Sequence, residues 1–153
     1  MKGFSLIELL IVFAIIGIAA SVSITMFNSY NRSQVFSSGV SDVASLLNVA
    51  RSRAVSQVKP ADCTDQNKAL DGYQVVVTLA GTSYEQDTVC AGTVYAPVQK
   101  NLPGQLTFDN TSAAKIFFNV STGTVTTPGS IVITGYGKTS TIKIDSTGNI
   151  NLP

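Results

Sequence analysis

An uncharged apolar run close to the amino terminus constrains this chain more than any other feature. From Leu9 to Asn31 no residue carries a formal charge, and a helix over this stretch is about 35 Å long at about 1.5 Å per residue. The hydrocarbon core of a bilayer is about 30 Å thick. The sequence therefore predicts a membrane-spanning helix. Glu8 lies at the start of this helix. Inserting a carboxylate into a bilayer costs about 2.5–3.5 kcal/mol on insertion scales, so Glu8 needs a partner or a function.

A secretory signal peptide is one alternative interpretation of this segment. Such a peptide has a basic start, a short apolar core and a small-residue cleavage site. Here Lys2 is the only basic residue before the run, the run is long, and an acid precedes it, so the segment fits a signal peptide poorly. A second alternative is that Glu8 is a charge merely tolerated at the edge of the helix.

The segment around Glu8 resembles the class III signal of type IV pilins and pseudopilins. Gly3 is followed by Phe4-Ser5-Leu6-Ile7-Glu8-Leu9-Leu10, which matches the family pattern without a gap. The resemblance implies cleavage by a prepilin peptidase and N-methylation of the new terminus, with the apolar residues buried in a filament. It assigns processing to Gly3 and Phe4, and assembly to Glu8, Leu6, Ile7, Leu9 and Leu10.

The resemblance also implies a role for Glu8. Cleavage leaves a positive amine on Phe4 inside an apolar bundle, and a buried charge needs a countercharge. In the family the acid is thought to meet the amine of a neighbouring subunit and so to set the axial stagger, which makes Glu8 a docking residue and not a catalytic one. One departure is that the chain has Thr25 near the position where many major pilins have proline, and its first proline is Pro60.

Beyond the apolar run the helical pattern continues but becomes amphipathic. Apolar residues recur at spacings of three and four, which is one face of a helix; they are Phe36, Val40, Val43, Leu47, Ala50 and Ala54. Lys59 and Pro60 supply a stop, so we expect a helix from about Ser5 to about Val58. The expected organisation is a leader at 1–3, an apolar helical half at 4–31, an amphipathic half at 32–59 and a head at 60–153.

The head reads as a β domain, because its composition turns to Val, Thr, Ile, Tyr and Gly with turn residues at short intervals. The two isoleucines of Thr141–Asp145 alternate with polar residues and are expected to face the core. The predicted fold is α+β, a long amino-terminal helix packed on a carboxyl-terminal antiparallel β domain. The expected strands are Tyr73–Leu79, Ser83–Thr88, Gln105–Phe108, Lys115–Val120, Ser130–Thr134, Thr141–Asp145 and Asn149–Leu152.

Three short segments of the later chain resemble the GspH/FimT-type minor pseudopilins of type II secretion and type IV pilus systems. They are Leu47–Val55, Lys115–Asn119 followed by Gly123, and Ile142–Ile150. DNA-uptake members of that group typically have a basic tail after the final turn. This chain instead ends that region with Asn149-Ile150-Asn151-Leu152-Pro153, which weakens a DNA-receptor interpretation.

The charge balance also disfavours nucleic acid as a partner. The chain has 10 Lys and Arg against 9 Asp and Glu, and removal of Lys2 with the leader would make the two numbers equal. Nucleic-acid binding depends on neutralising phosphates, whereas the head offers scattered lysines at positions 100, 115, 138 and 143. Lys138 and Lys143 sharing a patch across a hairpin is an alternative to simple solvated strand faces.

Cys63 and Cys90 are the only cysteines, and both fall in the part expected outside the cytoplasm. Oxidising compartments favour disulfides, and closing this loop would contribute on the order of 3 kcal/mol; two buried free thiols are the alternative. The chain has no histidine, so we expect no metal site of the zinc type. The oxygen-rich loop with Asp62, Asp65, Asn67 and Asp71 matches no calcium motif and is expected to be an exposed polar loop, with a calcium ion bound by converging oxygen ligands as the alternative.

Features of an enzyme are lacking in the sequence. There is no histidine to act as a base, no Gly-rich phosphate loop after a strand and no nucleophile with an identifiable partner, so no enzymatic activity and no cofactor are expected. Glu85 and Asp87 share one face of a predicted strand. Solvated strand charges explain this pair of carboxylates without catalysis.

The expected function is that of a structural subunit of a type IV pilus or type II secretion pseudopilus, of the minor H type. Expected partners are other pilin subunits, a prepilin peptidase, the membrane platform protein of the assembly machinery and, before assembly, the lipid bilayer. The protein is expected to cross the inner membrane once with its head outside the cytoplasm, and then to enter a periplasmic pseudopilus or a surface pilus. Alternatives are a filament-displayed DNA-binding or adhesive module, and an envelope protein that never polymerises.

Overall fold

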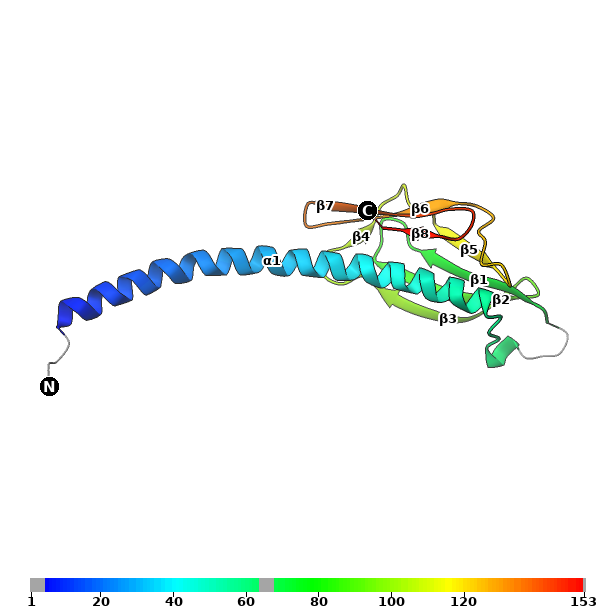
Figure 1. Ribbon diagram of the computed structural model, residues 1–153, viewed down its shortest axis with the longest axis horizontal. Coiled ribbons are helices and arrows are strands. Elements are labelled where there is room, and N and C mark those ends of the chain that lie inside the picture. Colours follow the sequence, from blue (N-terminus) through cyan, green and yellow to red (C-terminus); the bar gives the residue numbers. More distant parts are fainter. Residues whose placement is uncertain (1–4, 64–67, 153) are drawn as a thin grey trace. The chain divides into compact units, whose positions relative to one another are not determined.

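The computed structural model of the protein describes residues 5–63 and 68–152, and the side-chain surroundings of residues 19–25, 62 and 96 are not described. The chain divides into two compact units, residues 1–34 and 35–153. After Ser5, a single helix, α1 (Leu6–Val55, 50 residues), supplies the described part of the first unit and the first element of the second (Figure 1). The predicted α+β fold is confirmed, with a long helix and antiparallel sheets.

Helix α1 ends three residues before the expected Val58. Gln57 adopts a left-handed conformation with φ 52°, its N–H donates to the carbonyl of Ala54 at 3.3 Å, and the N–H of Val58 donates to the carbonyl of Arg53 at 3.1 Å. These two bonds form a Schellman motif, which satisfies the last carbonyls of a helix and reverses the chain. The helix therefore ends through its own backbone before Pro60 can act.

The amphipathic face of α1 is confirmed. Phe36 and Val40 are each 8% exposed, and Val43, Leu47, Ala50 and Ala54 are 0% exposed. Gly39 lies on the same face, where an added Cβ would come within 2.4 Å of Leu106 Cδ1. The helix thus approaches the loop before β4 so closely that a larger residue here would displace the end of the Leu106 side chain. This half of α1 is part of the head and not a stalk beneath it.

Two four-stranded antiparallel sheets make up the rest of the head (Figure 1). The first has the order β3-β2-β1-β5 and the second the order β4-β6-β7-β8. The strands are β1 (Leu70–Val77), β2 (Ser83–Cys90), β3 (Thr93–Asn101), β4 (Thr107–Phe108), β5 (Lys115–Asn119), β6 (Gly129–Gly135), β7 (Lys138–Ile144) and β8 (Ile150–Asn151). A short 3-10 helix, Ala61–Cys63, lies between α1 and β1.

Strand β3 has no counterpart among the predicted strands. Its sequence contains Pro97, and a proline within a run argues against a central strand. The structure places β3 at the edge of its sheet, and its pairing with β2 shifts register between Gln86 and Thr88. An edge position with a local irregularity is where a sheet tolerates proline, so this prediction failed because the place of a strand in its sheet cannot be read locally.

The remaining predicted strands are present with shifted bounds. Strand β1 begins and ends earlier than expected, β4 and β8 keep only two residues each, and β7 begins at Lys138, three residues before the expected Thr141. The turn between β6 and β7 consists of Tyr136 and Gly137 alone, both with positive φ. A two-residue turn with positive φ at both positions matches the twist of a hairpin, so the strand resumes immediately after it.

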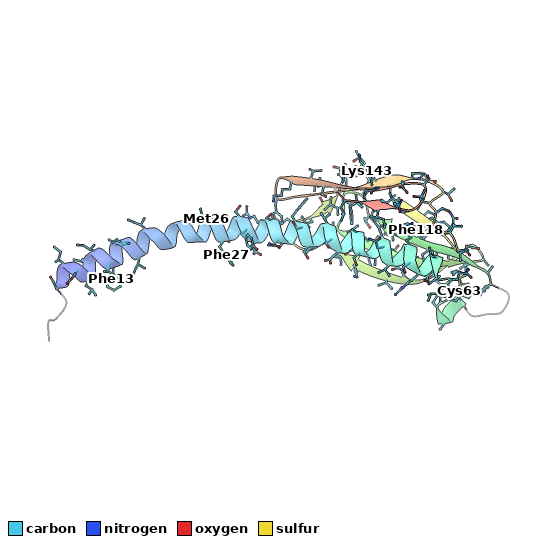
Figure 2. All side chains as sticks on the ribbon, in the orientation of Figure 1. Phe13, Met26, Phe27, Cys63, Phe118 and Lys143 are labelled. Atoms are coloured by element: carbon cyan, nitrogen blue, oxygen red, sulfur yellow. A yellow bond between two sulfur atoms is a disulfide. The ribbon has the colours of Figure 1, made fainter. Side chains whose placement is uncertain are left out.

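The core of the head lies between the buried face of α1 and the two sheets. Ile142 and Ile144 are 0% and 2% exposed, which confirms the prediction that these two residues of β7 face the core. Figure 2 labels Phe118 in this region, and its side chain is fully buried. Tyr84 is buried against Phe108 with an edge-to-face contact at 5.8 Å. Burial, and secondly the negative charge of Asp42, raise the pKa of the Tyr84 phenol.

Candidate assembly site

Glu8 lies in the first turn of α1 and is exposed. Its Oε2 accepts the backbone N–H of Ser5 at 3.3 Å, while the carbonyl of Ser5 accepts the N–H groups of Glu8 and Leu9. Ser5 is therefore the N-cap, and Glu8 occupies the third helical position, from which a carboxylate reaches back to cap the helix. The negative charge is also favourable beside the positive end of the helix dipole.

The capping role of Ser5 was missed from the sequence, although its signal was present. Serine followed three residues later by glutamate, before an apolar run, is the pattern of a capping box. In the isolated chain the Glu8 carboxylate is thus neither buried nor without a partner. Gly3 and Phe4, the predicted processing residues, lie outside the described residues.

The other predicted assembly residues surround Glu8 with apolar surface. Their exposed fractions are 77% for Leu6, 66% for Ile7, 53% for Leu9 and 62% for Leu10. A helix that is apolar on all sides is normally buried, and large contiguous apolar patches that stay exposed mark interaction sites. The surface continues through Ile11, Val12, Phe13, Ile15, Ile16 and Ile18, all at least 48% exposed.

The same exposed apolar character returns at the other end of this unit. Met26 and Phe27 are 70% and 68% exposed, and Figure 2 shows their side chains standing out from the helix, as does Phe13. Within the described parts of the chain, no helix combines the length and the hydropathy needed to span a bilayer.

Cys63 and Cys90 are joined by a disulfide, with their Cα atoms 6.3 Å apart. Both residues are 0% exposed. The bond connects the short 3-10 helix after α1 to the last residue of β2, and so it holds the polypeptide that leaves the long helix against the first sheet.

The acidic segment from Asp62 to Asp71 is described only in part by the structure. Asp65 and Asn67 lie outside the described residues, as do the side-chain surroundings of Asp62. Asp71 accepts the backbone N–H of Gly92 through Oδ2 at 2.7 Å, which closes the β2–β3 turn against β1. Among the described residues, no three His, Cys, Asp or Glu side chains gather to hold a metal ion.

Glu85 and Asp87 share the outer face of β2, but the prediction that both are solvated is wrong for Asp87. Its side chain is 3% exposed, Oδ2 accepts Gln74 Nε2 at 2.7 Å, and Oδ1 has no hydrogen-bond partner in the described part of the chain. Strand β3 was not predicted. It lies beside β2 and makes β2 an interior strand of the sheet.

Lys138 and Lys143 do not form the patch considered from the sequence. Lys138 and Lys143 lie at opposite ends of the same strand, β7, rather than across a hairpin. Their positions in the strand differ by five, an odd number, so their side chains leave opposite faces of the sheet. This arrangement provides no common surface for a phosphate backbone.

Comparison with known proteins identifies both parts of the chain. The family described as "Type II transport protein GspH" matches residues 39–148, and the prokaryotic N-terminal methylation motif matches residues 1–24. The type IV major fimbrial protein FimA of Dichelobacter nodosus is 39% identical over 71 residues, which are 46% of this chain and 42% of that relative. No solved structure matches. The chain therefore belongs to the type IV pilin and pseudopilin superfamily of envelope filament subunits, and its head is of the GspH type.

Proposed function

We propose that this chain is a minor, H-type subunit of a type IV pilus or type II secretion pseudopilus. A prepilin peptidase cuts it between Gly3 and Phe4, and the new amine of Phe4 is methylated. The support is the methylation motif at residues 1–24 together with the GspH match of the head.

One observation carries the proposal that the chain assembles into a filament, namely the apolar surface that surrounds α1 from Leu6 to Ile18. Exposing such a surface to water costs about 25 cal/mol of free energy per Å² of apolar area, so the surface needs either lipid or other apolar helices to cover it. Before assembly the bilayer covers it, with the platform protein of the assembly machinery beside it. After assembly the helices of neighbouring pilin subunits replace the lipid.

Glu8 is the only charged residue in this surface and directs assembly. In the isolated chain its carboxylate caps its own helix through Ser5. On docking, the carboxylate turns to the positive amine of Phe4 in a neighbouring subunit. The exchange is favourable because an amine buried in an apolar bundle without a countercharge costs several kcal/mol, whereas a helix cap contributes about 1 kcal/mol.

Two substitutions separate capping from charge pairing. Glu8→Ala removes both functions, whereas Glu8→Gln keeps an acceptor that can cap the helix but loses the negative charge. We expect both variants to reach the membrane fraction and neither to enter filaments sheared from the cells. Filament incorporation of Glu8→Gln at the level of the parent would show that the charge is not needed and would remove Glu8 from its docking role.

Mass spectrometry of the same fractions tests processing and the minor assignment. We expect an amino-terminal peptide that begins at methylated Phe4, present in filaments at a trace level relative to other pilins. If that peptide dominated the filament, the chain would be a major pilin. An uncut peptide that begins at Met1, found only in membranes, would contradict the filament function as a whole.

A further inference from the structure

The apolar surface of α1 gives way to polar residues shortly after Phe27. The side chain of Phe27 is 68% exposed, whereas the next two residues are polar and exposed. Tyr30 is 64% exposed. Arg32 is exposed as well, and it is the first charged residue after Glu8. The helix therefore passes from an apolar to a polar surface within about one turn.

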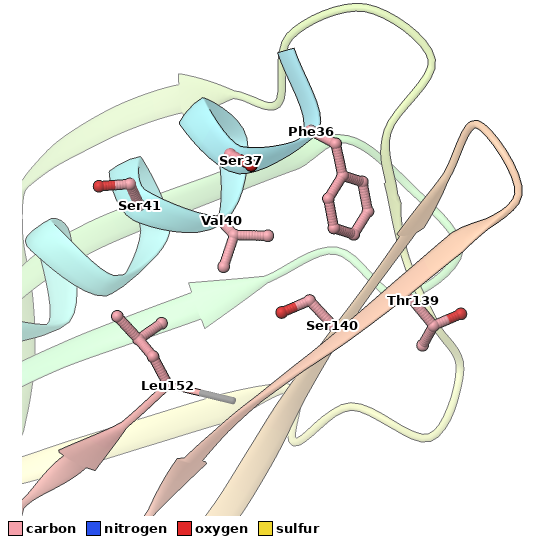
Figure 3. A pocket seen from close by; sticks show the side chains of 7 residues that line it. All are labelled: Phe36, Ser37, Val40, Ser41, Thr139, Ser140 and Leu152. Carbon is pink, nitrogen blue, oxygen red and sulfur yellow. The ribbon is translucent and has the colours of Figure 1, made fainter. Parts of the chain in front are cut away.

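Further along, the helix turns one face into the head. Phe36 and Val40 are each 8% exposed, and Figure 3 shows their side chains pointing from α1 towards β7. These two apolar side chains are thus covered by the chain itself, whereas Phe27 needs a cover of another kind. Residues 28–34 separate the two regions, and we call them the polar belt.

The length of the apolar surface matches the thickness of a bilayer. Phe27 follows Leu9 by 18 positions, which makes about 27 Å of helix, and the hydrocarbon core is about 30 Å thick. Arg32 follows Glu8 by 24 positions, or about 36 Å of helix, which is less than the 40–45 Å, roughly, of a bilayer with its headgroups. A helix that crosses the bilayer therefore holds Glu8 in one headgroup layer and Arg32 in the other.

The side chain of Tyr30 suits the boundary between lipid and water. Its hydroxyl oxygen accepts a hydrogen bond from Gln34 Nε2 at 2.8 Å, about one turn further along the helix. The polar end of this side chain is thus directed away from the apolar surface, while Phe27, three positions earlier, shares its face of the helix. Tyrosine is enriched at membrane–water interfaces because its ring is apolar and its hydroxyl is polar.

Arg32 lies at nearly the same level on the opposite side of the helix, because two positions correspond to a rotation of about 200°. The methylene stem of an arginine can lie along lipid chains while its charged end reaches water. Its planar guanidinium donates paired hydrogen bonds to phosphate oxygens. The phosphate of a phospholipid is therefore the ligand that matches Arg32 at this depth.

We propose that Tyr30 and Arg32 bind the phospholipid headgroups of the leaflet that faces away from the cytoplasm, and so fix the depth of α1 in the bilayer before assembly. Arg32 donates to lipid phosphate, and the ring of Tyr30 lies at the edge of the hydrocarbon. The depth set by the polar belt also keeps Glu8 in the headgroup layer of the other leaflet until it docks. The inference rests on the proposed function, because it takes the bilayer as the cover of this helix before assembly.

Two tryptophan probes test the depth of the helix. The chain has no tryptophan, so Tyr30→Trp and Ile16→Trp each provide a single probe in the full chain, reconstituted in vesicles of phosphatidylglycerol and phosphatidylcholine in equal parts. Ile16 is the control, because it is 56% exposed and lies two positions from the midpoint of Leu9–Phe27. We expect lipids brominated beside the headgroup to quench Tyr30→Trp at least threefold more than lipids brominated near the chain ends, and the opposite order for Ile16→Trp. Equal quenching of Tyr30→Trp by both lipids, or by neither, would overturn the inference.

Solid-state NMR tests the phosphate contact directly. The arginines of the chain, which are Arg32, Arg51 and Arg53, are labelled with a spin-active carbon isotope at the guanidinium, and dephasing of their signal by lipid phosphorus is measured in the same vesicles. We expect Arg32→Gln to abolish this dephasing. Arg53→Gln removes another exposed arginine of the same helix and should leave the dephasing unchanged. Dephasing that survives in Arg32→Gln, or that is absent from the parent chain, would contradict the phosphate contact.

These measurements separate the headgroup contact from the proposed function. If neither brominated lipid quenched Ile16→Trp, the helix would not enter the bilayer, and both the inference and the membrane stage of the proposed function would be wrong. If Ile16→Trp were quenched as expected but the signals of Tyr30→Trp and Arg32 were absent, only the headgroup contact would be wrong. Filament incorporation is measured separately, in sheared filaments.

Discussion

Replacing both cysteines, as Cys63→Ala with Cys90→Ala, is expected to destabilise the head by about 3.5 kcal/mol. The disulfide joins residues 27 apart in sequence, and in the chain-entropy description a cross-link over such a loop removes about 12 cal/mol/K from the unfolded chain. At 25 °C this entropy corresponds to about 3.5 kcal/mol. Domains of this kind are stable by only about 5–15 kcal/mol, so the loss is a large fraction, and Tm should fall by roughly 15 °C.

Denaturant unfolding of the full chain in detergent measures this effect. The chain has no tryptophan, but Tyr73 and Tyr84 are each 2% exposed in the head, so tyrosine fluorescence follows its unfolding. The parent chain in reductant is the control, because it breaks the bond without deleting the sulfur atoms. A double variant that unfolds within about 1 kcal/mol of the oxidised parent would refute the loop-entropy argument.

Two further predictions concern the packing and the acid stability of the head. Leu47→Ala should cost about 3 kcal/mol in denaturant unfolding because Leu47 is 0% exposed, whereas Val49→Ala, at a 38% exposed position, should cost less than about 1 kcal/mol; equal losses would contradict the assigned helix face. Hydrogen bonds from the Thr147 hydroxyl at 2.6 Å and the Asn149 N–H at 2.9 Å hold the pKa of the Asp145 carboxyl below its ordinary value. The stability that this carboxylate gives the folded head is therefore complete above its unfolded pKa of about 3.9 and is lost as pH falls through the lower folded pKa. The variant Asp145→Asn lacks this titration, so its Tm should fall less steeply in acid than the Tm of the parent. An equally steep fall would contradict the assignment.

The helix and most strands were predictable because their signals are local. The spacing of Phe36, Val40 and Leu47 selects one helical face wherever the helix lies, and the alternation around Ile142 and Ile144 selects one face of a strand. The end of the helix was less predictable. Pro60 gave a visible stop, but the chain reversed earlier at Gln57, a residue type that carries no strong signal for a left-handed conformation.

The candidate assembly site and the other candidate residues were also predictable only in part. The apolar surface around Glu8 follows from composition alone, and the cap formed by Ser5 was readable from a four-residue pattern. The burial of Asp87 was not predictable, because the alternation of residues along β2 gives only the face of the strand and not the tertiary surroundings of that face. Strand β3 was missed as well, because Pro97 lies within it and proline argues against a strand.

By itself, the sequence determined that the first part of this chain needs an apolar partner, that the helix then turns one face to a core, and that the rest forms antiparallel strands. Each of these properties depends on residues within a few positions of one another. Only the tertiary structure decided which elements the two cysteines join and that Asp87 is buried. These features depend on sheet order, which is set by contacts between residues far apart in the chain, and no local pattern records them.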